Sequence, residues 1–429
     1  MKIRLALVAG SPVYYQAPLY RRIAGDPHIE LTAIFASTAG ALRPFENGFG
    51  TPVDFGVDAL EGYSSRFLKK AGSNPSGGST FDLHDRDVVA AVWRGRYDVL
   101  WLHGYHTMTH VLAAVAQKAR GGAILYREEQ TLLNPRPRWK TALKHVGLPW
   151  LFQGSYGLFI GIENRRWFER WGMPPERLFP VPYAVDNEAL QRAAFELAPR
   201  RERLRMELGV RRDAGPVILM VGRLIPKKQP MHMLEAYRRV RASRPCSLLV
   251  VGSGPLEDAL RRKVAVEEIP DVVFAGFRSQ TEIARAYAAA DIFALVSSHD
   301  ETWGLVVNEA MNFRLPIVAS DRVGSTSDLV RSGQNGFVVP HDDLDALVAV
   351  LNRLIESSDL RERFGDASLA MILPRTYDVA AAGLVTAVRA AVGESRWMLA
   401  EASAMTSVAP QNPDKEHPSV DMISMEPLR

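Results

Sequence analysis

Apolar runs of strand length alternate with amphipathic helical stretches along most of this chain, and the whole alternation occurs twice in 429 residues. Strands that alternate with helices predict parallel sheets with helices on both faces. The length allows two such units. The strands expected from apolar runs are 2–9, 29–35, 98–102, 123–127 and 158–162 in the first half, and 217–221, 247–251, 272–275, 292–296, 316–319 and 336–339 in the second.

The two units are expected to meet in a charged helical stretch between two domains, the first at 1–195 and the second at 205–373. Residues 37–85 are rich in Gly, Ser and Pro and predict an irregular segment, which suits either an acceptor-binding loop or disorder. Residues 394–429 mix Ser, Pro, Met and charges without periodicity, and they predict a disordered tail.

Composition excludes several classes of protein. The net charge of +4 is mild, so nothing indicates a nucleic-acid partner, and no apolar run is long enough to span a bilayer. The apolar start of the chain is interrupted by Arg4 and indicates a buried strand rather than a signal peptide. The single Cys246 has no partner for a disulfide within the chain. These features favour a cytoplasmic protein.

Three expected strands end in groups that suit an anionic ligand. The first is followed by Gly222, Arg223 and Lys228, and such a loop can clamp a diphosphate with a planar fork and a point charge. A solvated loop with three cations is the alternative. The other two strands are followed by glycines that let the backbone approach a ligand closely, at Gly252, Gly254 and Gly276, with Phe277 next to the last.

Two carboxylates stand eight positions apart around the start of an expected helix. Glu301 lies in a loop, Trp303, Gly304 and Leu305 lead into the helix, and Glu309 lies within it. A helix N-terminus attracts phosphate, so its backbone N–H groups and both carboxylates could face one ligand. The alternative is a surface helix with two ordinary acids.

These elements, in this order, resemble the family 4 retaining glycosyltransferases, which have the GT-B fold. The resemblance rests on Gly-Arg-x4-Lys at 222–228, Val-Gly-x-Gly-Pro at 251–255, Phe-x-Gly at 274–276, Glu-x7-Glu at 301–309, Pro-Ile-Val-Ala-Ser at 316–320 and Asn-Gly-Phe-Val-Val-Pro at 335–340. Looser matches at 15–20, 60–63 and 160–164 look like a subgroup that builds bacterial surface polysaccharides.

The resemblance implies an α/β protein with two Rossmann-like domains whose parallel sheets face each other across a cleft. The first domain would bind the acceptor and the second the nucleotide sugar, and a C-terminal helix at 376–393 would cross back to the first. The implied function is that of a retaining, metal-independent, hexosyltransferase-type enzyme in surface polysaccharide biosynthesis. It would move a sugar from a UDP-, GDP- or ADP-sugar to a saccharide or lipid-linked acceptor, with no cofactor.

The family pattern also assigns roles to residues. Glu309 would hold the ribose and Glu301 would face the donor sugar, while Arg223 and Lys228 would stabilise the leaving diphosphate. The chain has no Asp-x-Asp motif of the usual metal-binding kind, no His-Glu-x-x-His motif and no Cys pair, so no metal site is predicted. The donor-binding set would be Gly222, Gly252, Gly254, Gly276, Phe277, Trp303, Gly304, Leu305 and Glu309.

The first domain offers two candidate histidines for a catalytic base. His103 and His106 follow an expected strand at its carboxyl end, where α/β sheets place ligands. A capping or packing role explains each of them equally well. Many relatives have a histidine after the next strand, where this chain has Arg127-Glu128-Glu129, so the base stays unassigned. The leaving phosphate could itself act as the base.

A basic, aromatic stretch at 136–152 predicts peripheral contact with the anionic inner face of a membrane. A half-buried helix with a solvated cationic face is the alternative. Two other functions also remain open: a nucleotide-sugar epimerase or other enzyme on the same fold, and a non-catalytic scaffold that binds nucleotide sugars. The cations and aromatics of the stretch are Arg136, Arg138, Lys140 and Lys144 with Trp139 and Trp150.

Overall fold

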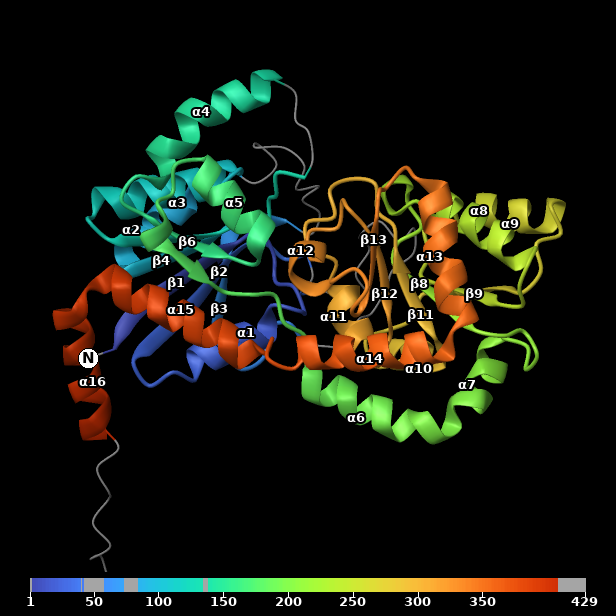
Figure 1. Cartoon of the computed structure of the whole chain (residues 1–429). Coiled ribbons are helices and arrows are strands. Elements are labelled where there is room, and N and C mark those ends of the chain that lie inside the picture. Colours follow the sequence, from blue (N-terminus) through green and yellow to red (C-terminus); the bar gives the residue numbers. More distant parts are fainter. Residues whose placement is uncertain (1, 40, 42–57, 73–83, 134–137, 408–429) are drawn as a thin grey trace, which may run out of the picture.

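The computed structural model describes residues 2–39, 41, 58–72, 84–133 and 138–407, which form two α/β domains side by side (Figure 1). Every strand pairing within the two sheets is parallel. Both sheets place the domain's first strand next to its fourth, so that the chain winds outward in both directions from this pair. Ligands bind at such switch points, beyond the carboxyl ends of the strands.

The first sheet has the order β3-β2-β1-β4-β5-β6-β7. Alternate residues of its central strand pack on opposite faces, with Leu5 and Leu7 on one side and Ala6 and Val8 on the other. The strands are β1 (Ile3–Ala9), β2 (Ile29–Ser37), β3 (Ser64–Gly72), β4 (Val99–His103), β5 (Ala123–Arg127), β6 (Tyr156–Phe159) and β7 (Leu178–Pro180). The helices are α1 (Ala17–Ala24), α2 (Asp87–Gly95), α3 (Met108–Ala119), α4 (Arg138–Phe152) and α5 (Ile162–Arg170).

The second sheet repeats this topology in the order β10-β9-β8-β11-β12-β13. Its strands are β8 (Val217–Val221), β9 (Ser247–Val251), β10 (Val272–Gly276), β11 (Ile292–Leu295), β12 (Ile317–Ser320) and β13 (Gly336–Val339). Its helices are α8 (Pro230–Arg241), α9 (Glu257–Val266), α10 (Ile283–Ala289), α11 (Leu305–Asn312), α12 (Thr326–Leu329), α13 (Leu344–Glu356) and α14 (Ser358–Ile372). All eleven strands expected from apolar runs occur, within a few residues of the expected bounds.

The irregular segment predicted over 37–85 contains a strand that the sequence did not reveal. β3 pairs with β2 in parallel, with Thr32 opposite Ser64 and Phe35 opposite Phe67. It lies at the edge of the sheet, where one side faces solvent and polar residues are normal, so it lacks the apolar run of a central strand. Residues 42–57 and 73–83 lie outside the described part of the chain.

The chain returns to the first domain through α15 (Tyr377–Val392), which packs on the same face of the first sheet as α1 and contacts α1 (Figure 1). The disordered tail predicted from residue 394 is wrong for its first part, because α16 (Glu394–Ser407) follows at once. Trp397 anchors this helix: its side chain is buried, and its ring lies 5.1 Å from that of His28. Residues 408–429 lie outside the described part.

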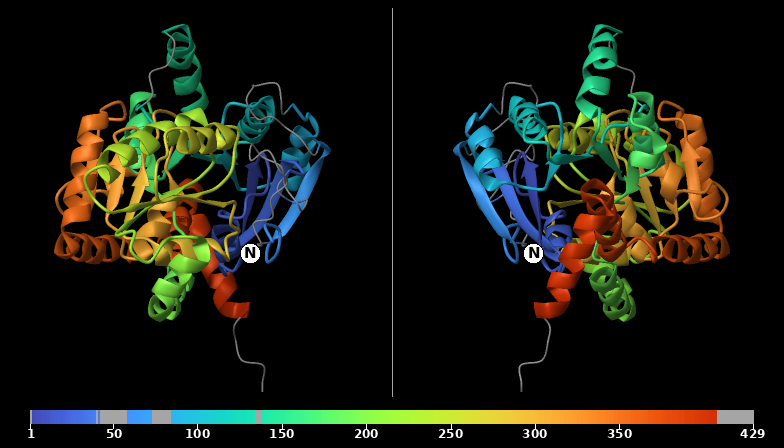
Figure 2. Two further views of the ribbon diagram at one scale, coloured as in Figure 1. Left: turned by 90° about the vertical axis from the view of Figure 1, so that its right-hand side faces the viewer. Right: turned by 90° about the vertical axis from the view of Figure 1, so that its left-hand side faces the viewer.

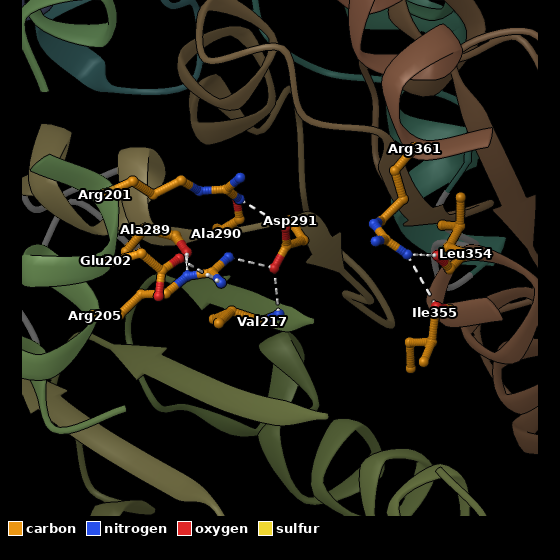
Figure 3. A network of polar contacts seen from close by, with 10 residues as sticks. All are labelled: Arg201, Glu202, Arg205, Val217, Ala289, Ala290, Asp291, Leu354, Ile355 and Arg361. Atoms are coloured by element: carbon orange, nitrogen blue, oxygen red, sulfur yellow. Dashed lines mark hydrogen bonds and ion pairs between the residues drawn. The ribbon is translucent and has the colours of Figure 1, made fainter. Parts of the chain in front are cut away.

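Two helices, α6 (Asn187–Leu197) and α7 (Arg201–Leu208), join the domains, and a carboxylate fixes the second of them, α7, to the second sheet (Figure 3). Asp291 Oδ1 accepts from Arg201 Nη2 at 2.7 Å, and Oδ2 accepts from Arg205 Nη2 at 2.6 Å and from the Val217 amide at 2.7 Å. A cavity of about 590 Å³ lies between this linker and α14, with Arg361 in its wall. None of the predicted site residues lines this cavity.

Helix α4 projects from the body of the first domain (Figures 1 and 2). Its last turns are anchored, since Leu148, Leu151 and Phe152 are buried in the core, while Trp150 is 59% exposed. None of the described helices is long and apolar enough to cross a bilayer.

Candidate functional site

A cavity of about 170 Å³ lies where the carboxyl ends of the two sheets meet. Tyr14, in the loop after β1, closes it from the first domain, and the rest comes from the ends of β8 and β9, the loops after β8, β9, β10 and β11, and the helices α10 and α11. Eight of the predicted site residues line this cavity: Gly222, Lys228, Gly252, Phe277, Glu301, Gly304, Leu305 and Glu309. Strands at the switch point of the second sheet therefore bring the predicted donor-binding groups together.

Lys228 and Glu301 form an ion pair in the wall of this cavity, with only 12% and 11% of their side chains exposed. Ser297, which is fully buried, donates from Oγ to Glu301 Oε2 at 3.0 Å. Burial by itself would raise the pKa of Glu301, but the charge and hydrogen bond of Lys228, the charge of Lys227 and the Ser297 hydroxyl together lower it below the usual value. Glu301 is therefore held as a carboxylate.

Glu309 has a different environment, although it lines the same cavity. Tyr287 donates from its hydroxyl to Oε2 at 2.6 Å, and Gln280 donates from Nε2 to Oε1 at 3.1 Å. Burial raises the pKa of this carboxyl, and the two hydrogen bonds only partly oppose the rise. The two glutamates are thus tuned in opposite directions.

Glycines allow the loops around the cavity to approach one another. Gly222 has φ 143° and Gly252 has φ 131°, conformations that residues with a side chain rarely adopt. A Cβ on Gly252 would lie 2.0 Å from the Gly222 carbonyl oxygen, and one on Gly254 would lie 2.7 Å from the Leu224 carbonyl oxygen. Only glycine fits where these two loops cross.

The start of α11 opens onto the cavity. Gly304 precedes the helix with φ 90°, and no side chain caps the N-terminus. The first backbone N–H groups of a helix have no partner within it, and they carry a partial positive charge. Leu305 and Val306 line the cavity, so these N–H groups and Lys228 form an anion-binding wall.

The other predicted donor-binding residues support the loops rather than line the cavity. Trp303 is 2% exposed, donates from Nε1 to Asn308 Oδ1 at 2.8 Å and packs its ring against Tyr183 of the first domain. The carbonyl of Gly276 accepts from the Gly252 amide at 2.8 Å. Arg223 lies outside the lining; burial lowers the pKa of Lys227, and the charges of Lys228 and Arg223 add to this effect.

The two candidate histidines have separate environments. His103 is largely buried, with Nε2 3.3 Å from Glu129 Oε1 and Nδ1 3.4 Å from the Tyr20 hydroxyl. His106 is exposed, and its ring lies 6.5 Å from that of His110, which is buried. Neither histidine lines the cavity that holds Lys228, Glu301 and Glu309.

The basic stretch at 136–152 is less available than the sequence suggested. The Lys144 ammonium lies over three aromatic rings of the first domain, at 5.7 to 5.9 Å from their centres. Lys118 donates to the carbonyls of Trp150, Leu151 and Gln153 and so closes the end of α4. Arg136 lies outside the described residues, and the side chains of residues 138–140 are not described either.

The sequence analysis did not identify four groups that the structure places at the site: Tyr14, Gln280, Tyr287 and Ser297. Tyr14 and Gln280 line the cavity, while Tyr287 and Ser297 donate hydrogen bonds to the two glutamates that line it. Only Tyr14 gave a signal, since it follows the first strand of a parallel sheet at the switch point.

Comparison with known proteins identifies glycosyltransferases as relatives. Residues 205–371 match the family described as glycosyl transferases group 1. An alpha-D-kanosaminyltransferase of Streptomyces kanamyceticus is 29% identical over 213 residues, which are 49% of this chain and 53% of that protein. A D-inositol 3-phosphate glycosyltransferase of Thermomonospora curvata is 31% identical over 288 residues, 64% of this chain and 62% of that protein. The chain therefore spans less than two thirds of the length of either relative.

Solved structures share the fold over nearly the whole chain. The crystal structure of Anabaena HepE in complex with UDP has a TM-score of 0.67 at 19% identity, and it covers 91% of this chain and 100% of that one. This likeness confirms the predicted GT-B architecture of two Rossmann-like domains.

Proposed function

We propose that this chain, whose residues 205–371 belong to the glycosyl transferases group 1 family, transfers a hexosyl group from a nucleoside diphosphate sugar to a hydroxyl acceptor. One observation carries the proposal: Lys228, Glu301, Glu309 and the open start of α11 surround a single cavity between the domains. A diphosphate needs cations and N–H donors, a ribose needs a hydrogen-bond acceptor, and the cavity offers all three.

The proposed roles follow from the environment of each group. Lys228 and the first amides of α11 would bind the diphosphate and stabilise its charge as it leaves. Glu309 would accept hydrogen bonds from the ribose hydroxyls. Glu301, which stays ionised, would lie beside the donor sugar, where positive charge develops in the transition state. No metal is assigned, because the loop cations can meet the charge of the diphosphate.

The finer parts of the proposal rest on the family resemblance. They are retention of configuration, metal independence, a saccharide or lipid-linked acceptor and a role in surface polysaccharide biosynthesis. HepE was solved with UDP, which favours a UDP-sugar among the three donor classes. The proposal also includes peripheral contact of α4 with the inner face of the membrane.

Ligand-induced stabilisation tests the donor class directly. A nucleotide at about 100 times its dissociation constant raises the free energy of unfolding of a protein that binds it by about 2.7 kcal/mol. UDP, GDP and ADP are to be compared in this way. We expect one of them to raise the melting temperature of the wild type and to have less effect on Lys228→Ala. Absence of stabilisation by all three would contradict the proposal. Incubation with the sugar nucleotide alone separates transfer from epimerisation, since an epimerase converts the sugar without an acceptor.

A further inference from the structure

A carboxylate of the first domain, Glu129, lies at the end of β5 and is held by two neighbours through one oxygen. Tyr183 donates its hydroxyl hydrogen to Glu129 Oε1, and His103 approaches the same oxygen with Nε2 at 3.3 Å. The side chain is 30% exposed, and among the contacts of the described residues none involves Oε2. One oxygen of the carboxylate is therefore fixed, and the other is available to a ligand.

The same contacts make His103 unsuited to act as a base. A carboxylate oxygen only accepts hydrogen bonds, so Nε2 carries the proton that it donates to Glu129. The Tyr20 hydroxyl lies 3.4 Å from Nδ1 and donates to it. Both ring nitrogens are then engaged, and Nδ1, the nitrogen without a proton, faces the buried Tyr20 hydroxyl rather than an acceptor. Its place in the structure is that of a positioning residue for Glu129.

A buried cation lies beside this carboxylate. Arg127 is 1% exposed, its guanidinium lies 5.1 Å from the centre of the Tyr183 ring, and Nη1 donates to the Val181 carbonyl at 2.8 Å. Burial lowers the pKa of Arg127, and the negative charge of Glu129 opposes this. Arg127 and Glu129 are therefore electrostatically coupled, so a change at Glu129 must preserve its shape to be informative.

Tyr183 connects Glu129 with the helix that carries the donor-binding glutamate. Its carbonyl accepts from Asn308 Nδ2 at 3.4 Å, and its ring packs on Trp303, with centroids 6.0 Å apart. On the other side its ring lies 5.9 Å from Tyr15, which lies 5.4 Å from Tyr14 in the wall of the donor cavity. Glu129 thus lies at the edge of the first sheet that faces the donor.

We infer that Glu129 binds and orients the acceptor, accepting a hydrogen bond from its attacking hydroxyl group through Oε2. The inference rests on the proposed function, and it gives the first domain an acceptor-orienting carboxylate while leaving open the catalytic base for which the sequence analysis offered His103 and His106. The ligand class is a saccharide or polyol hydroxyl. In this inference Glu129 does not remove the proton of the acceptor hydroxyl. The leaving diphosphate can still take that proton.

Glu129→Gln is the informative change. The amide keeps the shape of the side chain, and its oxygen can still accept from Tyr183 and His103. The other position now carries an NH2 group, which donates where the carboxylate accepted. The assay measures nucleotide release from the sugar nucleotide found in the screen above, with water, glycerol and methyl α-glucoside as hydroxyl probes.

We expect Glu129→Gln to lower kcat with each probe roughly 10- to 100-fold, the effect of one hydrogen bond to a charged group. The KM for the donor, the affinity for the nucleoside diphosphate and the melting temperature should stay close to wild type. Glu169→Gln is the matched control, since Glu169 makes a surface ion pair with Arg165 in α5. Tyr183→Phe keeps the ring on Trp303 but frees Glu129, so it should lower kcat less than Glu129→Gln does.

Three results would overturn the inference. Glu129→Gln could turn over at the wild-type rate, or it could lose donor affinity together with stability, which would show a structural role. A wild-type protein that binds the nucleotide but releases none with any probe would also exclude the hydroxyl-orienting role, while donor binding stands. A wild-type protein that binds no nucleotide refutes the proposed function instead, so the two failures are distinct.

Discussion

Lys228, in the loop after β8, is ion-paired with Glu301, in the loop after β11, and the pair forms part of the wall of the donor cavity. Because both side chains are about nine-tenths buried, each stabilises the charge of the other. In the proposed function, the pair would present an ammonium to the diphosphate and a carboxylate to the donor sugar at adjacent points. Changes at either residue must therefore be interpreted together.

Lys228→Ala should lower turnover roughly 10²- to 10³-fold, the effect of losing one donor to a developing anion.

The effect of Lys228→Ala on stability should depend on pH as well. The lowered pKa of Glu301 contributes stability at neutral pH that is lost as the pH falls through the folded-state pKa. The variant should therefore be destabilised more at pH 7 than at pH 3. Steady-state kinetics and thermal unfolding measure both effects, with Lys263→Ala in α9 as a surface control. Retention of half the wild-type rate would remove Lys228 from the site.

The two glutamates should differ in their kinetic effects. Glu309 is proposed to hold the ribose, which the reaction leaves unchanged, so Glu309→Ala should chiefly raise the KM for the donor. Glu301 is proposed to lie where charge develops, so Glu301→Ala should chiefly lower kcat with little change in nucleotide affinity. Initial-rate kinetics with calorimetric binding of the nucleoside diphosphate would separate the two, and the opposite pattern would reverse the roles.

Gly252→Ala should destabilise the second domain and abolish nucleotide binding, because the new Cβ would overlap the Gly222 carbonyl. The matched control is Gly154→Ala. Gly154 also has a positive φ, 73°, but the space around its Cβ position is open. The control should cost only about 1 kcal/mol of backbone strain. Equal melting temperatures for the two variants would show that the crossing loops can move apart.

Chelation should leave turnover unchanged once the donor is saturating, because the loop cations and helix amides are proposed to meet the charge of the diphosphate. The measurement is the initial rate before and after treatment with excess EDTA, followed by addition of Mg²⁺ or Mn²⁺. A strict requirement for either ion would contradict the proposed roles of Lys228 and the first amides of α11.

Sedimentation with anionic vesicles should be weakened by salt and by Trp150→Ala, since Trp150 is the exposed aromatic of the anchored end of α4. Lys144→Ala should change vesicle binding little, because the Lys144 ammonium lies over aromatic rings within the domain. Equal binding to neutral and anionic vesicles would rule out the electrostatic part of this contact.

The fold was predictable because its signal is local. A buried parallel strand must be an apolar run, and runs of this kind marked the central strands of both sheets within a few residues. The edge strand β3 and the helix α16 escaped prediction for the converse reason. The strand β3 is stabilised by its pairing with β2, and the helix α16 by the burial of Trp397. Neither contact can be predicted from the local sequence pattern.

The amino-acid sequence by itself determined which groups stand at the ends of the strands, including Lys228, Glu301 and Glu309. It also determined where only glycine could allow two loops to cross. Only the tertiary structure decided what each group contacts. In the folded chain the Tyr287 hydroxyl donates to Glu309, and His103 contacts Glu129 rather than solvent. Each contact joins residues that lie 22 or 26 positions apart in the chain and on neighbouring elements of one domain, so its geometry depends on how those elements pack together, which spacing along the chain does not specify.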